Sequence, residues 1–333
     1  MTISTLSKCC RLPIALCFWL WCCLSPVYAL SKTQQQAIVA VMGSQTPLWQ
    51  LAPQDYTFSG LALGSFQRSN QYVELHYQNT TTKGMSSRFV LEQHQSKPRD
   101  AKCTPSEKPI VLQHQSWGAL TLCSRVMPNR SDWVLIRGFV LETQPYIKVD
   151  FQGPPKRFMA LMKNIRPLSL AHLSASAPQR STSQVSRGFY PQQIKFNKAG
   201  FAPGDEKLYW NKSRSQPVWS QIYHQAIPFI EQDITFHFTV GLRHTPYSQI
   251  VRNTKQCGRQ QKKQRYQHPQ LGPYLLCMKH SSSSAPATAR VPREFSKVSV
   301  FAYPLAGNKR PHASFHFSAF SEQVEQTLRA IYF

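Results

Sequence analysis

The sequence predicts an α+β fold built from two tandem copies of one small domain. Each copy is expected to be an antiparallel sheet with an intradomain disulfide and a C-terminal amphipathic helix packed on it. Three observations support this: a repeated cysteine motif, short alternating apolar runs, and a helical pattern at the end of each copy. The motif reads Gln-His-x-x-Φ-Gly-x-x-x-Leu-Cys, with Φ apolar, at residues 113–123 and again at 267–277, an offset of 154 residues. Solenoid repeats have periods of roughly 20 to 50 residues, so this spacing indicates a duplicated domain.

Residues 1–29 have the features of a cleaved secretory signal peptide. Lys8 and Arg11 form a basic start, residues 13–24 are apolar but too few to span a bilayer, and Ala29 ends a small-residue cleavage site. We therefore expect a periplasmic or secreted protein, cleaved near Ala29, with no transmembrane segment in the mature chain.

The cysteines outside the signal peptide are Cys103, Cys123, Cys257 and Cys277. An even number of cysteines in an exported chain indicates disulfides. Four cysteines allow three connectivities, and the repeat favours Cys103 with Cys123 and Cys257 with Cys277. Each bridge would close a loop of about 20 residues, which contributes roughly 3 kcal/mol if the unfolded chain loses only entropy.

The first copy is assigned to residues 30–168. Ser31 and Gln34 fit a capping box, so a short helix is expected from there to Gly43. The alternating apolar runs that follow predict strands at 72–77, 88–92, 110–113, 119–124, 133–141 and 146–151. Apolar residues at helical spacing between Lys156 and Arg166 predict the closing helix.

The second copy is assigned to residues 189–333, after a linker at 169–188 that is rich in Ser, Ala, Pro and Gln. We align residues 234–240 with the strand at 72–77. Residues 311–317 match 145–151 at an offset of 166, so a loop insertion is expected around 281–289. Strand 298–303 and a final helix carrying Val324, Leu328 and Ile331 complete this copy.

The charge of the chain points to an anionic partner. The formal net charge is +24, and only 15 residues are acidic. Outside the cytoplasm, such an excess favours an acidic protein or an anionic envelope polymer or lipid, with nucleic acid a less favoured alternative. A basic composition that serves only solubility is the other interpretation.

The segment between the cysteines of the second copy is the candidate binding site. Residues 258–266 contain four cations and no acid, whereas the corresponding residues 104–112 are nearly neutral. Arg binds carboxylate or phosphate through two parallel hydrogen bonds, Lys supplies a point charge, and Tyr can stack on a ring. The candidate binding residues are therefore Arg259, Lys262, Lys263, Arg265 and Tyr266. A solvated loop with no binding role is the alternative.

An enzymatic alternative comes from two short motifs. His237-Phe238-Thr239 and His312-Ala313-Ser314 resemble the paired His-x-Thr/Ser motifs of the 2H phosphoesterase family. The resemblance implies that His237 and His312 act as base and acid while Thr239 and Ser314 hold the phosphoryl oxygens. His316-Phe317-Ser318 is a competing second motif. The other interpretation is that these histidines line a half-buried sheet face.

No other motif points to catalysis. The chain lacks a Gly-rich phosphate loop, H-E-x-x-H, G-x-S-x-G and CxxC, so we expect no cofactor and no metal. His114 and His268, each four residues before a shared glycine, are interpreted as structural. The sequence therefore favours a non-catalytic exported binding protein over an enzyme. Its partner would be an envelope polyanion or lipid, or an acidic protein such as a toxin or hydrolase that it inhibits.

Overall fold

The computed structural model describes residues 30–52, 56–66, 70–80, 86–98, 103–173, 179–211, 216–228, 235–245, 257–281 and 297–333. The predicted signal peptide lies outside these residues. The helices are α2 (Lys32–Met42), α3 (Pro155–Met162), α4 (Thr182–Phe189) and α6 (Val324–Arg329). Short 3-10 turns lie at Ala171–Leu173 and Ser321–Gln323.

The strands of the first half of the chain are β1 (Leu48–Leu51), β2 (Thr57–Phe66), β3 (Asn70–Thr80), β4 (Ser86–His94), β5 (Lys108–His114), β6 (Gly118–Met127), β7 (Arg130–Val140), β8 (Tyr146–Gly153) and β9 (Ile165–Leu168). Those of the second half are β10 (Lys195–Phe196), β11 (Ala202–Asn211), β12 (Val218–Pro228), β13 (Thr235–His244), β14 (Lys262–His268), β15 (Gly272–Ser281), β16 (Lys297–Pro304), β17 (Ala313–Phe320) and β18 (Ile331–Tyr332). All six strands expected in the first copy are present.

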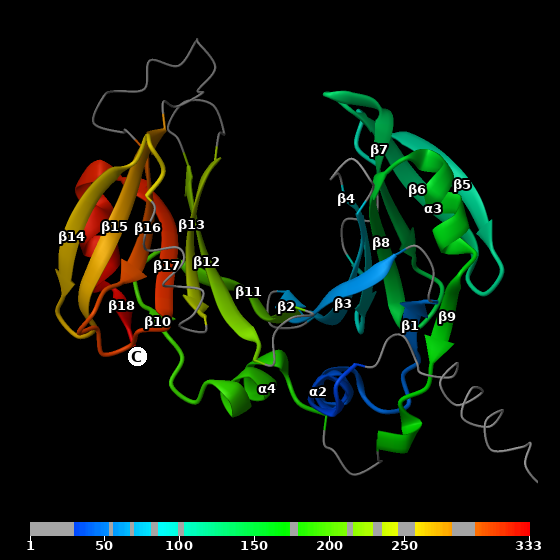
Figure 1. Ribbon diagram of the computed structural model, residues 1–333, viewed down its shortest axis with the longest axis horizontal. Helices are drawn as coiled ribbons and strands as arrows, with labels where there is room; N and C mark the ends of the chain where they lie inside the picture. Colours follow the sequence, from blue (N-terminus) through cyan, green and yellow to red (C-terminus); the bar gives the residue numbers. More distant parts are fainter. Residues whose placement is uncertain are drawn as a thin grey trace, which may run out of the picture.

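One antiparallel sheet of 14 strands runs through both halves (Figure 1). Its order is β14-β15-β16-β17-β13-β12-β11-β2-β3-β4-β8-β7-β6-β5. The order is symmetric about its centre. The outermost strands, β14 and β5, are corresponding strands of the two halves, and so is each following pair up to the central strands β11 and β2. The α+β class is therefore confirmed in outline, but a single sheet joins the halves where two separate sheets were expected. Strands β1 with β9 and β10 with β18 form two small additional sheets.

The strand order corrects one alignment between the halves. Residues 234–240 lie in β13, which corresponds to β4 and not to the strand at 72–77 in β3. The error arose because β2, β11 and β12 were not predicted. Strands β2 and β11 pair at the centre of the sheet, where Gly60 and Gly64 make room for the rings of Tyr209 and Tyr72.

The N-terminal helix forms as predicted. The Ser31 hydroxyl accepts a hydrogen bond from the Gln34 N–H at 3.2 Å, and the Gln34 side chain accepts one from the Ser31 N–H at 2.8 Å. This capping box satisfies two amide donors that the first turn would leave unpaired. The chain leaves the helix at Gly43, whose φ of 87° is a conformation that favours glycine.

The other helical segments differ from the expectation. Helix α3 ends at Met162, so Ile165 begins β9 and is not part of the closing helix. Ile331 likewise lies in β18, after α6. The segment expected to be an unstructured linker contains α4, which begins with a second capping box formed by Ser181 and Gln184.

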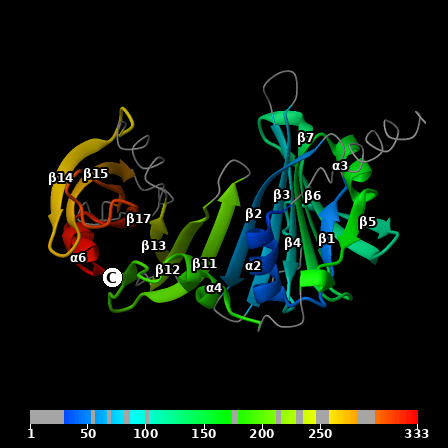
Figure 2. The ribbon, with the colours of Figure 1, turned by 60° about the horizontal axis from the view of Figure 1, so that its bottom comes forward.

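The core lies on one face of the large sheet. A buried row crosses the central strands from Trp210 through Leu61, Leu75 and Leu91 to Val149. Helix α2 contacts β2 and β3, α3 contacts β7 and β8, α4 contacts β11, and α6 contacts β17. Figure 2 shows α2 and α4 lying along the middle strands. The opposite face carries no helix among the described residues, and we call it the uncovered face.

Candidate binding surface

The predicted basic loop is largely an edge strand. The disulfide between Cys257 and Cys277 confirms the expected pairing, and a turn follows in which the Gly258 N–H donates to Gln261 Oε1 at 2.7 Å. Lys262 to His268 then form β14, which pairs only with β15 among the described strands. Arg259 is in the turn, and Lys262, Lys263, Arg265 and Tyr266 are in the strand. This corrects the loop interpretation and gives these residues fixed directions.

The side chains of β14 point to both faces of the sheet. Lys263 pairs with Cys277 and Arg265 with Leu275, on the uncovered face. Tyr266 pairs with the fully buried Tyr274 and packs partly against the core, so its ring is directed away from that face. Lys262 shares the face of Tyr266 because side chains alternate along a strand. The cations of β14 and Arg259 are all exposed.

The uncovered face of the second half continues this positive surface inward. One row runs across five strands from Gly241 through His316, Phe301 and Cys277 to Lys263. The rings of His316 and Phe301 are stacked, with centroids 4.1 Å apart and planes 15° apart. Arg243 lies two residues beyond Gly241 on the same strand, and it is exposed.

The described strands β12 to β17 contain no Asp or Glu, and this is the main electrostatic feature of the second half. Their cations are Arg243, Lys262, Lys263, Arg265, Lys279 and Lys297. Burial, with the Arg243 charge as a second cause, lowers the pKa of His316, so its ring is largely neutral at pH 7. Burial also raises the pKa of Tyr303, against the effect of Arg243, so its hydroxyl stays protonated. This surface is therefore positive and partly aromatic.

The first half places acids and bases together on the same face. Glu92 accepts from Lys148 Nζ at 2.7 Å and lies 3.1 Å from His94 Nε2, and Asp150 lies 2.9 Å from Lys148. Burial alone would raise the pKa of Glu92, but the His94 hydrogen bond and the Lys148 charge lower it to about 2. On the neighbouring strand Glu74 pairs with Lys207 at 2.8 Å.

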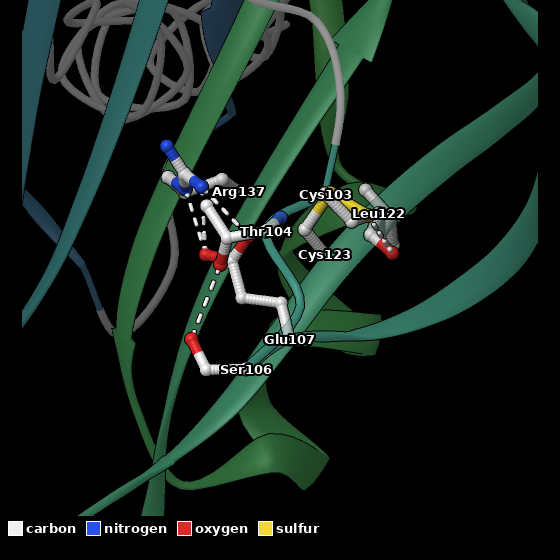
Figure 3. The surroundings of a disulfide bond; sticks show 7 residues. All are labelled: Cys103, Thr104, Ser106, Glu107, Leu122, Cys123 and Arg137. Atoms are coloured by element: carbon white, nitrogen blue, oxygen red, sulfur yellow. Dashed lines mark hydrogen bonds and ion pairs between the residues drawn. A yellow bond between two sulfur atoms is a disulfide. The ribbon is translucent and has the colours of Figure 1, made fainter.

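The first disulfide also has an ion pair beside it. Cys103 is bonded to Cys123 as predicted, and Arg137 donates to both oxygens of Glu107 at 2.7 Å (Figure 3). A hollow of about 630 Å³ is lined in part by six charged residues, Glu74, Glu92, Glu107, Arg137, Asp150 and Lys207. Every acid among these six has a basic partner, so the acids around this hollow are compensated by neighbouring cations.

The two shared histidines have the structural role expected of them. His114 Nε2 donates to the Met162 carbonyl at 2.9 Å, and His268 Nε2 donates to the Leu328 carbonyl at 2.9 Å. In each case Nδ1 accepts a turn N–H two residues on, at 3.2 Å. Each histidine thus ties a hairpin turn to the end of a helix. The glycine that follows, Gly118 or Gly272, has positive φ in both turns.

The strand register separates the residues of the phosphoesterase alternative. Ser314 pairs with Arg243, which lies four residues from Thr239 along β13. The His312 carbonyl accepts from the Thr245 N–H, and residue 245 is eight positions from His237. At about 3.3 Å per residue, the hydroxyls are about 13 Å apart along the sheet and the histidine positions about 26 Å apart. The His237 and His312 motifs are therefore too far apart to surround one phosphate.

In the part of the chain that the structure describes, no group of three or more His, Cys, Asp or Glu side chains could hold a metal ion. None of the helices in the described ranges has the length and hydrophobicity that a membrane span requires. The two disulfides fit an oxidising, extracytoplasmic compartment.

No protein-family model and no curated protein matches the chain. Among solved structures, a crystal structure of MucB in complex with MucA(peri) is 10% identical, covering 90% of this chain and 97% of that chain at a TM-score of 0.17. The complex structure of Pseudomonas aeruginosa MucA/MucB has the same identity and coverages, with a TM-score of 0.18. A crystal structure of MucB is also 10% identical, covers 90% and 96%, and has a TM-score of 0.18. At such TM-scores these similarities support no inference about fold or function.

Proposed function

We propose that this protein is a non-catalytic extracytoplasmic binding protein that recognises an acidic polypeptide through its second half. The observation that carries the proposal is the absence of acids from β12 to β17, six strands that hold six cations. In the first half the charges of the uncovered face are compensated by their own neighbours. Strands β12 to β17 have no acid of their own that could provide such compensation, so their field attracts an anionic partner.

The position of the cations favours a polypeptide over an anionic polymer or lipid. Strand β14 is the last strand of the sheet, so its outer main-chain groups have no partner strand among the described residues. An extended segment can add to such an edge through main-chain hydrogen bonds. Carboxylates on that segment would then lie next to Lys263 and Arg265 on one face and Lys262 on the other. A polyanion without a peptide backbone would use the charges alone.

The test is a charge substitution on the exposed cations of the candidate site. Arg259, Lys262, Lys263 and Arg265 are changed together to Gln, and a control variant changes Lys97, Lys108, Arg125 and Lys163, four exposed cations of the first half. Both variants lose four charges. Binding of a fluorescent Asp/Glu-rich 12-residue peptide is measured by anisotropy at low and physiological salt. We expect the site variant to bind at least about tenfold more weakly and the control less than about threefold.

Two results would contradict the proposal. Equal weakening by both variants would mean that net charge alone attracts the peptide. A peptide with N-methylated alternate amides, which cannot pair with β14, should also bind more weakly than its unmodified form. If it binds equally well, or if heparin and anionic vesicles compete as effectively as the peptide, the ligand is a polyanion and the strand-addition argument is wrong.

A further inference from the structure

One position on the uncovered face of the second half has no side chain. Gly241 of β13 pairs with Ile222 of β12 on one side and with His316 of β17 on the other. Among the residues that the structure describes, a Cβ placed on Gly241 would have a single atom within 4 Å, the His316 carbonyl oxygen at 3.4 Å. The space above Gly241 is therefore open between two flanking side chains, and we call it the Gly241 gap.

The width of the Gly241 gap suits one flat ring. Neighbouring strands are about 4.8 Å apart, so Ile222 and His316 stand about 9.6 Å apart across Gly241. The half-thicknesses of their side chains leave about 5 to 6 Å, enough for one aromatic ring. On its other side His316 is already stacked on Phe301 at a centroid distance of 4.1 Å. A ring in the gap would extend this stack to three members.

The charge beside the gap is positive. Arg243 follows Gly241 by two residues, so the two lie on the same face about 7 Å apart along the strand. Its cross-strand partner is Ser314, and strands β12 to β17 hold no acid that could neutralise it. A ring in the gap thus places a neighbouring carboxylate within reach of the guanidinium.

The first half shows what a closed version of this position looks like. Counting across the sheet from the disulfide, Cys277, Phe301, His316 and Gly241 correspond to Cys123, Arg137, Asp150 and Val90. The valine occupies the place of Gly241, and Glu92 occupies the place of Arg243. Among the described residues, the gap, the stacked rings and an arginine at the position of Arg243 are therefore found at this place in the second half and not in the first.

We propose that the Gly241 gap receives an aromatic side chain of the acidic polypeptide, from a part of it that crosses the uncovered face four strands inward from β14. A carboxylate one or two residues from this ring would bind Arg243. The proposal rests on the proposed function and adds the partner's sequence character, an aromatic residue flanked by acids. The ring gains stacking on His316, and the carboxylate gains a charge-assisted hydrogen bond. The contacts between the partner's carboxylates and the cations of β14 do not depend on this gap. The gap and the β14 contacts can therefore be tested separately.

The experiment measures a preference between peptides. Two acidic 12-residue peptides differ only in a central Phe or Ala, and their dissociation constants are compared by anisotropy. The wild-type protein should prefer Phe roughly three- to tenfold, the range that one aromatic contact contributes. Gly241→Val introduces the residue that the first half carries and should abolish the preference for Phe. Gly241→Ala should reduce the preference. Thr239→Val, on the same strand and face, should retain it.

The outcomes distinguish this inference from the proposed function. If wild type binds both peptides equally, or if Gly241→Val keeps the preference for Phe, the gap is not an aromatic pocket although acidic binding stands. If neither peptide binds wild type, the proposed function itself fails. Thermal melting of each variant shows whether it is folded, and an unfolded Gly241→Val leaves Gly241→Ala to decide.

Discussion

The first prediction concerns Glu206 of β11, which holds the helix between the two halves against the sheet. Its side chain is only 3% exposed, and its carboxylate accepts hydrogen bonds from Ser183 Oγ at 2.5 Å, Ser186 Oγ at 2.6 Å and Trp219 Nε1 at 2.7 Å. The serines are on α4 and the tryptophan is on β12, so one carboxylate joins the segment expected to be a linker to the sheet. Glu206→Leu keeps an apolar side chain of similar size but leaves all three donors without their acceptor.

The expected cost follows from these three bonds. An unsatisfied buried donor costs about 1 to 3 kcal/mol, and the two hydroxyls can partly reorient, so the total is about 3 to 5 kcal/mol. At about 2 °C per kcal/mol for a chain of this size, the melting temperature should fall by roughly 6 to 10 °C. Hydrogen exchange should also show earlier exchange of the α4 amides.

The matched control for this prediction is an acid on the surface. Glu325 pairs with Arg329 on an exposed helix face at 2.7 Å, and Glu325→Gln should change the melting temperature by less than about 1 °C. A drop of under about 2 °C for Glu206→Leu, with unchanged exchange in α4, would refute the reasoning, because the carboxylate would then contribute nothing net to holding α4 on the sheet.

Two other predictions concern histidines. His268→Ala removes the buried hydrogen bond between the β14–β15 turn and the Leu328 carbonyl, so the free energy of unfolding in urea should fall by about 2 to 3 kcal/mol. His114→Ala should have a similar effect, because it removes the corresponding bond to Met162. Unchanged stability would mean that these hydrogen bonds are dispensable. Burial, helped by the charges of His312 and Arg310, lowers the pKa of His244 to about 4, whereas an unfolded histidine titrates near 6.5. Between these values the unfolded chain binds more protons, so stability should fall as the pH drops from about 6.5 to 4, and His244→Gln should lessen that fall. An identical pH dependence in wild type and His244→Gln would show that His244 is not responsible.

Features that depend on neighbours in the chain were predictable. The Ser31 capping box and the Gly43 stop concern groups a few residues apart, and both form as expected. The repeated motif predicted the correct disulfides, because each copy of the domain carries its own pair of cysteines at the same spacing and each pair forms a bond within its copy. The strands with clear alternation were also found, since one side of each is buried.

Features that depend on distant neighbours were missed or misplaced. The basic segment has no apolar alternation because it consists largely of Lys, Arg and Gln, so its sequence predicts a loop, yet residues 262–268 pair with β15 and form a strand. Strand β12 was not predicted, and so β13 was aligned with the wrong strand of the first half. The continuous sheet depends on the pairing of β2 with β11, whose paired residues are about 145 positions apart in the sequence. No local sequence pattern predicts such a contact.

Composition and short-range spacing were enough to predict the kinds of elements, the cysteine pairing and the scarcity of acids near the basic segment. The three-dimensional fold was needed to show which side chains lie next to one another on a face. Alternation assigns each residue to one of two faces, but the strand that lies beside it is chosen by the burial of the whole core. Gly241 becomes a gap only because β17 brings His316 next to it from 75 residues away.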